Sequence, residues 1–122
     1  MPARLRALRG ATTVDRDSAD HVAERVVALV EEMLGRNSIA HDELVSILFT
    51  ATDDIHSVFP ATAARTIGLG DVPLICAREL DIAGATPRCI RVMMHLYTEA
   101  EPASLHHVYL EGARGLRDDL PE

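Results

Sequence analysis

Two stretches of this chain read as buried β-strand and carry charged residues among their apolar ones. The first ends with residues 76–79, which read Cys-Ala-Arg-Glu, and the second covers residues 89–96 and contains Arg91. A guanidinium stays charged in a protein and has five donors, so burying it without anionic partners is costly. Two interpretations follow: a structural ion pair between Arg91 and Glu79, or a site that binds an anionic ligand.

The other arginines of the chain favour the interpretation as a site that binds an anionic ligand. All 12 basic residues are arginines, and several lie in similar apolar settings, Arg9 and Arg65 among them. A guanidinium fork matches the two oxygens of a carboxylate better than an ammonium does. A GC-rich genome would also replace lysine with arginine, so composition by itself leaves both interpretations open.

The composition restricts the class of protein. With 122 residues, residues 1–122 are predicted to form one domain, large enough for a real core and small enough to gain from oligomerisation. Aromatic residues make up only 3% of the chain, tryptophan is absent, and the net charge is −7. These features argue against a nucleic-acid partner, because such binders use basic patches and stacking platforms.

The cysteines and the N-terminus predict a cytoplasmic protein. Cys76 and Cys89 match no metal-ligand spacing and no disulfide framework, which is typical of free thiols in a reducing compartment. The basic start lacks the apolar core of a signal peptide. No run is long enough to span a membrane, so no membrane partner is expected.

The N-terminal third predicts a strand and a long helix. Residues 3–13 alternate, and Gly10 within them indicates a bulge or a close approach of backbone. The period then becomes helical, with Asp17 or Ser18 as the N-cap and Gly35 at the end. The expected apolar face of this helix is Val22, Val26, Leu29, Val30, Met33 and Leu34.

The remaining chain predicts four further strands and one short helix. Strands are expected at 44–50, 73–79, 87–98 and 106–110, and a helix at 60–67 that Gly68 and Gly70 close. Residues 118–122 are expected to be a frayed tail. The fold class is therefore α+β, with a mixed sheet of about five strands. Two helices cannot cover both sheet faces, so a second subunit is expected on the other face.

Five short motifs follow one another along the chain. They are residues 9–14 (RGATTV), residues 59–61 (FPA), the pair Cys76 and Glu79, residues 89–94 (CIRVMM) and residues 107–111 (HVYLE). The set, from about residue 4 to 120, resembles the monofunctional, trimeric chorismate mutases of the α/β pseudo-barrel type. The chain departs from that family at Thr62, where a lysine is common, and in a short loop between Gly68 and Gly70.

This resemblance implies a function. It implies a homotrimer that forms a pseudo-α/β-barrel with active sites between subunits. It also implies an isomerase of aromatic amino-acid biosynthesis that rearranges chorismate to prephenate without a metal, cofactor or covalent intermediate. Chorismate carries two carboxylates, an ether oxygen and a hydroxyl, so its site needs several donors and one acceptor.

The resemblance also assigns roles to individual residues. Arg91 would face the breaking ether bond and a carboxylate, Arg9 and Tyr109 would bind carboxylate oxygens, Glu79 would accept the ring hydroxyl, and Cys76 would lie beside Glu79. The substrate-binding set would be completed by Phe59, Ala61 and Leu74 against the ring, Arg65 and Arg117 at the mouth, and Ile75 and Leu116.

The sequence also suggests three alternative interpretations. Small trimeric proteins of the same general fold bind small acids or process imines, but a plain carboxylate binder needs no acceptor such as Glu79. The pair His106 and His107 suggests a metal site, yet adjacent strand residues point to opposite faces. Residues 53–56 resemble an acidic cluster, and their place after a strand favours a turn.

Overall fold

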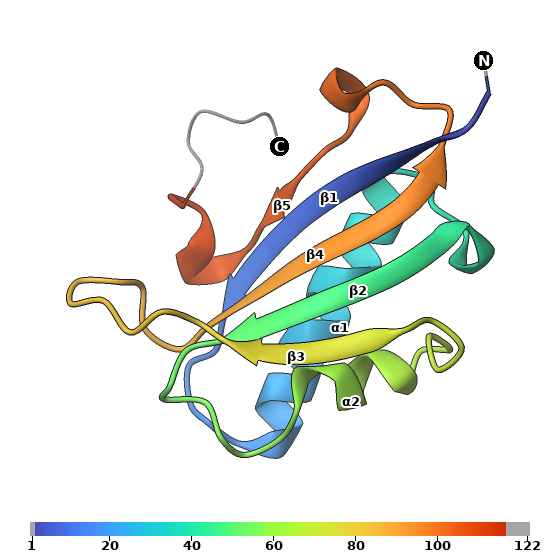
Figure 1. Ribbon diagram of the computed structural model, residues 1–122. Helices are drawn as coiled ribbons and strands as arrows, with labels where there is room; N and C mark the ends of the chain where they lie inside the picture. The colour runs from blue at the N-terminus through green and yellow to red at the C-terminus, as the bar shows by residue number, and fades with distance from the viewer. Residues whose placement is uncertain (1, 117–122) are drawn as a thin grey trace.

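A five-stranded mixed sheet forms the centre of the computed structural model, which describes residues 2–116 as one α+β domain (Figure 1). The sheet order is β3-β2-β4-β1-β5. The central pairs of β4 with β1 and with β2 are antiparallel, and both edge strands pair in parallel. The strands are β1 (Arg4–Thr13), β2 (Leu44–Ala51), β3 (Leu74–Arg78), β4 (Cys89–Thr98) and β5 (Val108–Tyr109).

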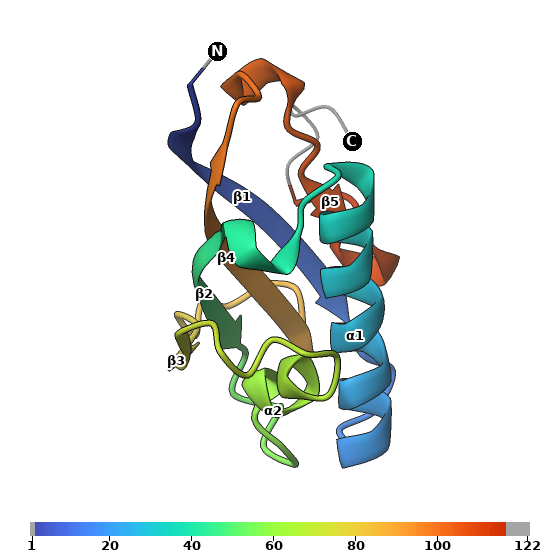
Figure 2. The same cartoon turned by 90° about the vertical axis from the view of Figure 1, so that its right-hand side faces the viewer.

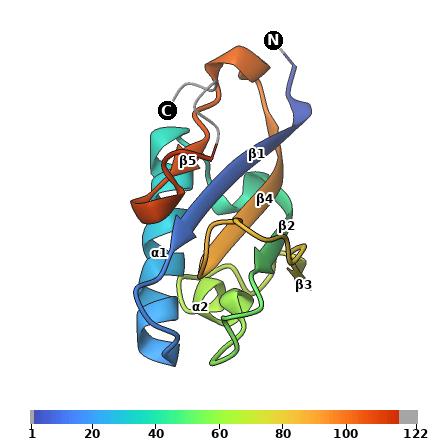
Figure 3. The same cartoon turned by 90° about the vertical axis from the view of Figure 1, so that its left-hand side faces the viewer.

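Both helices cover the same face of this sheet (Figures 2 and 3). α1 (Ala19–Arg36) begins at Ser18, whose hydroxyl accepts the His21 N–H at 3.3 Å. α2 (Pro60–Arg65) begins with proline at its first position, where no N–H partner is needed. The apolar positions predicted for the long helix are all buried, as are the alternate β4 residues Ile90, Val92, Met94 and Leu96.

Gly10 is a point of close approach between the sheet and α1. A Cβ atom there would lie 2.5 Å from Met33 Sδ and 3.1 Å from Leu29 Cδ1. The close-approach interpretation of Gly10 is therefore confirmed, and the register of β1 against β4 runs through it without a bulge. The absent side chain allows α1 to seat directly on the sheet.

The predicted number of strands and helices is confirmed, and several boundaries differ by one or more residues. α1 passes Gly35 and ends at Arg36, followed by the C-cap residue Asn37, whose amide donates to Met33 O at 2.8 Å. α2 ends at Arg65 rather than at 67. The strand expected at 106–110 is reduced to Val108–Tyr109, because the Arg9 N–H bonds the His107 ring nitrogen at 3.0 Å instead of a backbone carbonyl.

The second face of the sheet carries no helix within residues 2–116 (Figure 2). Large apolar side chains remain exposed there, including Leu5, Ile75 and Tyr97, each more than half accessible. Short 3-10 turns occupy His41–Glu43, Pro102–Ser104 and η3 (Glu111–Ala113). Among the described residues, no helix has both the length and the apolar character needed to cross a membrane.

Candidate functional site

A hollow of about 210 Å³ lies on the open face of the sheet. Strands β1, β2, β4 and β5 supply its floor, and the residue after β3 supplies one wall. The lining residues are Arg9, Gly10, Ala11, Leu48, Thr50, Glu79, Arg91, Val92, Met93 and Tyr109. Four of the predicted site residues, Arg9, Glu79, Arg91 and Tyr109, therefore meet within one chain.

Arg91 and Glu79 form the charged centre of the hollow. Arg91 Nε lies 3.5 Å from Glu79 Oε2, and the Thr50 hydroxyl donates to the same carboxylate oxygen. The Glu79 N–H is held by Ala51 O at 3.0 Å. Half of the Arg91 side chain is still exposed, so its remaining donors are available to a ligand.

Strand register brings the other two residues to this pair. Ala11 lies opposite Arg91 on β4, and Tyr109 lies beside Ala11 on β5. Arg9 is two residues before Ala11 and so projects to the same face. The arrangement thus combines two guanidinium groups, a phenol and one carboxylate, which suits a ligand with several anionic oxygens and one hydroxyl.

A second group of predicted residues lies around the β3 edge. Phe59 stands just before α2 and is 71% exposed, Arg65 is exposed in the last turn of α2, and Ile75 is 64% exposed. Cys76 pairs in register with the buried Phe49, which puts it on the helix-covered face. A hollow of about 760 Å³ lies here, with Phe59 and Cys76 in its lining.

One chain therefore does not place Cys76 beside Glu79. Residues in a strand alternate, and Cys76 and Glu79 differ by an odd number of positions. Of the other predicted residues, Ala61 is buried in the main core, Leu74 packs against that core, and Leu116 packs against Tyr109, Ala11 and Ala113. Arg117 lies outside the described residues.

The loop before α2 is anchored by carboxylates. Asp17 accepts the N–H groups of His56 and Ser57, both at 3.1 Å, and the Ser57 hydroxyl and these contacts hold the pKa of Asp17 below its ordinary value. Asp53 binds both arms of Arg78 at 2.6 and 2.7 Å, which lowers the pKa of Asp53. The turn interpretation of residues 53–56 agrees with these bonds.

Three residues near the site, Cys89, His106 and His107, are either buried or bonded to neighbouring segments. Burial raises the pKa of the Cys89 thiol, although Arg91 works in the opposite direction. His107 accepts the Arg9 N–H through Nδ1. The backbone of His106 bonds the Asn37 amide at both its N–H, 2.7 Å, and its carbonyl, 2.9 Å.

Sequence reasoning missed three residues that hold the site's surroundings in place. Thr13, Arg25 and Asn37 join α1 to β1 and to the segments on either side of β5. Arg25 lies outside the predicted apolar face of the helix, yet its side chain is only 17% exposed. The sequence does contain an indication of this burial, because Arg25 directly precedes the buried Val26 and so lies at the border of the apolar face.

Comparison with known proteins identifies close relatives. The family described as Chorismate mutase type I matches residues 5–120. The chain is 40% identical over 117 residues to Chorismate mutase AroH of Bacillus subtilis, covering 95% of this chain and 92% of the relative. It is 42% identical to Chorismate mutase AroH of Thermus thermophilus over 117 residues, 95% and 96% of the two chains. A solved chorismate mutase from Clostridium thermocellum superimposes with a TM-score of 0.88 at 42% identity, covering 89% and 97%.

Proposed function

This chain belongs to the type I chorismate mutase family and is an isomerase, and from that premise we propose how its residues act on chorismate. The observation that carries the proposal is the Arg91–Glu79 pair, 3.5 Å apart in a hollow that also contains Arg9 and Tyr109. In the proposal Arg9 and Tyr109 bind carboxylate oxygens, and Glu79 accepts the ring hydroxyl. Arg91 contacts a carboxylate and the ether oxygen.

Two physical terms account for the rate. A unimolecular rearrangement gains nothing from gathering reactants, so the site must select the compact conformer in which the reacting carbons approach each other. Negative charge then develops on the ether oxygen as its C–O bond breaks. A preorganised guanidinium stabilises that charge without needing to reorient at the moment of reaction. The rearrangement transfers no proton to the protein, so no general acid or base is required.

The complete site is proposed to lie between two copies of the chain. Arg9, Glu79, Arg91, Tyr109 and Leu116 would form one half, and Phe59, Arg65, Ile75 and Cys76 of a neighbouring copy the other. The support is geometric: Cys76 and Glu79 belong to opposite sheet faces, while Phe59 and Ile75 expose apolar surface that no residue of 2–116 covers. Three copies would close the open sheet faces into a pseudo-barrel, so we propose a homotrimer.

The activity is tested by adding purified protein to chorismate. We expect the ultraviolet absorbance of chorismate to disappear and prephenate to form, with no added metal or cofactor. Solvent deuterium should leave a chemistry-limited rate nearly unchanged. Cys76→Ser should lower turnover by less than about tenfold, because a hydroxyl replaces a weak thiol donor. A large isotope effect, or complete loss in the serine variant, would point instead to proton transfer or covalent catalysis.

The interfacial site is tested by mixing two inactive variants. Arg91→Ala and Arg65→Glu damage different proposed halves, so trimers refolded from an equal mixture should regain about a quarter of the wild-type activity. The matched control is a mixture of Arg9→Ala and Arg91→Ala, which damage the same half and should regain none. Recovery in the control, or an active monomer in sedimentation, would contradict the proposal.

A further inference from the structure

Tyr109 is carried by a strand that is too short to position it alone. β5 contains only Val108 and Tyr109, which pair with Gly10 and Ala11 at the sheet edge. The next residue adds one bond, from the Leu110 N–H to Ala11 O at 2.9 Å. A strand this short gains little cooperative support from its ladder, so contacts that flank it must determine where the phenol stands.

The segment that follows β5 is held by the last residue of β1. The Gly112 N–H donates to the Thr13 hydroxyl at 2.9 Å, across 99 positions of sequence. Glu111, one residue earlier, has a φ of 53°, a left-handed conformation that a non-glycine residue rarely adopts. Such a conformation persists only where surrounding contacts impose it.

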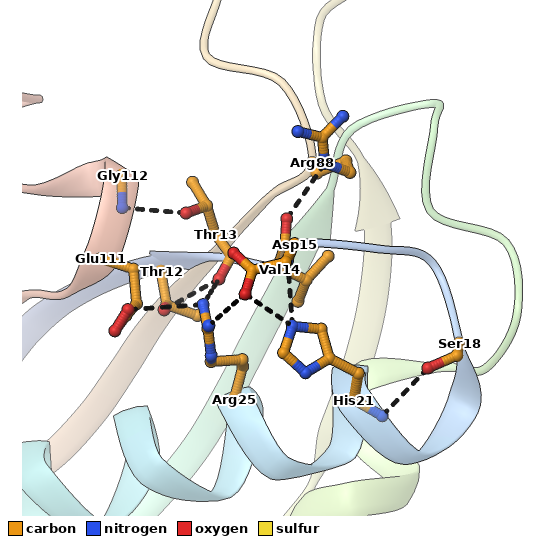
Figure 4. A network of polar contacts seen from close by, with 10 residues as sticks. All are labelled: Thr12, Thr13, Val14, Asp15, Ser18, His21, Arg25, Arg88, Glu111 and Gly112. Atoms are coloured by element: carbon orange, nitrogen blue, oxygen red, sulfur yellow. Dashed lines mark hydrogen bonds and ion pairs between the residues drawn. The ribbon is translucent and has the colours of Figure 1, made fainter.

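Arg25 supplies these contacts from α1 (Figure 4). Its Nη1 donates to Thr13 O at 2.6 Å and lies 3.5 Å from the Glu111 carboxylate. Its Nη2 donates to Asp15 Oδ2 at 2.9 Å. With three acceptors around a mostly buried side chain, one guanidinium joins the helix, the end of β1 and the turn after β5.

The same turn packs against the Tyr109 ring. Tyr109, Ala11 and Ala113 form a small buried cluster that is separate from the main core, and Leu116 packs against it. Ala113 is the last residue of η3, which Glu111 opens. Any shift of η3 therefore moves the surface on which the phenol rests.

We infer that Thr13, Arg25 and Glu111 form a latch that positions Tyr109 in the substrate hollow. Thr13 and Arg25 act through Tyr109 and are positioning residues, not catalytic ones. The inference rests on the proposed role of Tyr109 as a ligand of a chorismate carboxylate. The latch replaces the ladder hydrogen bonds that a two-residue strand lacks.

The first experiment measures kcat/KM with chorismate for Thr13→Val, which keeps the shape of the side chain and removes its hydroxyl. We expect a fall of about threefold to tenfold, the range for one lost hydrogen bond, and rescue in Thr13→Ser. The matched control is Thr98→Val, since Thr98 also accepts a backbone N–H, from Ala100 at 3.1 Å, at the other end of β4. The effect of Thr13→Val should disappear when Tyr109 is already changed to phenylalanine.

The second experiment observes Tyr109 without needing activity. The chain has two tyrosines and no tryptophan, so Tyr97→Phe leaves Tyr109 as the single fluorophore. Acrylamide quenching of this 7% exposed side chain should rise in Thr13→Val and in Arg25→Gln, and should stay unchanged in Thr98→Val. Unchanged quenching, or an equal loss of kcat/KM with and without the Tyr109 hydroxyl, would overturn the inference. If wild-type protein left chorismate untouched, the proposed function would fail, and quenching would still decide whether the latch holds Tyr109.

Discussion

The two faces of the sheet differ although the same strands form both. On the helix-covered face Phe49 and Val92 are almost fully buried. Their sequence neighbours Thr50 and Arg91 lie on the open face and line the hollow. Since side chains alternate along a strand, adjacent residues serve different purposes, one packing against α1 and α2 and the other facing a ligand. A substitution at a residue on the covered face should therefore change stability, and a substitution at its neighbour on the open face should change activity.

The largest expected effect is on stability, from the covered face. Phe49→Ala removes a fully buried ring and should lower the free energy of unfolding by about 3–5 kcal/mol. Urea unfolding at fixed protein concentration measures this loss. The matched control is Phe59→Ala, the same deletion at a side chain that is 71% exposed, which should cost much less stability and reduce activity instead. Equal costs for the two variants would contradict the division between the faces.

The next effect is on turnover, from the open face. Arg91→Lys keeps the charge and loses the fork, so kcat should fall by about 10²–10³-fold while the unfolding free energy barely changes. Citrulline at position 91 keeps the hydrogen-bond geometry without the charge and should be slower still. Arg36→Lys, in an exposed pair with Glu32 on α1, is the control and should keep full turnover. Citrulline performing as well as arginine would rule out electrostatic stabilisation.

A smaller effect is expected where the covered face meets α1. Gly10→Ala places a Cβ atom 2.5 Å from Met33 Sδ and should cost about 1–3 kcal/mol of stability through overpacking. Gly35→Ala is the matched control, because its added Cβ would face open space among the described residues. That change within α1 should stabilise the protein by about 0.5–1 kcal/mol. Thermal unfolding of both variants checks that Gly10→Ala lowers stability and that Gly35→Ala raises it.

The smallest effect concerns acid stability at the β3 edge. Arg78 holds the folded-state pKa of Asp53 below its ordinary value of 3.8, so this carboxylate stabilises the fold above that value. Its contribution should be lost as the pH falls below 3.8 and through the lowered pKa. Asp53→Asn should therefore make stability less dependent on pH in this acidic range, as measured by urea midpoints.

The chorismate mutase resemblance and the α+β class followed from local patterns. The alternation in residues 89–96 indicated that Arg91 lies on one face and the apolar residues on the other, and the structure confirms this for β4. The helical period of α1 indicated its buried residues for the same reason, because periodicity depends only on neighbours in sequence. The end of α1 and the length of β5 were not predictable, since Asn37 and His107 bond groups about 70 and 98 positions away.

The sequence by itself determined which residue types are available and which strand face each one takes, because parity within a strand is a local property. Only the tertiary structure decided which of them meet. The antiparallel register sets Ala11 opposite Arg91, and the parallel pairing sets Tyr109 beside Ala11. The contacts of Arg25 with Thr13 and Glu111 arise in the same way. Such contacts depend on how α1 packs on the sheet and on the path of the chain. The spacing of residues along the sequence indicates neither of these.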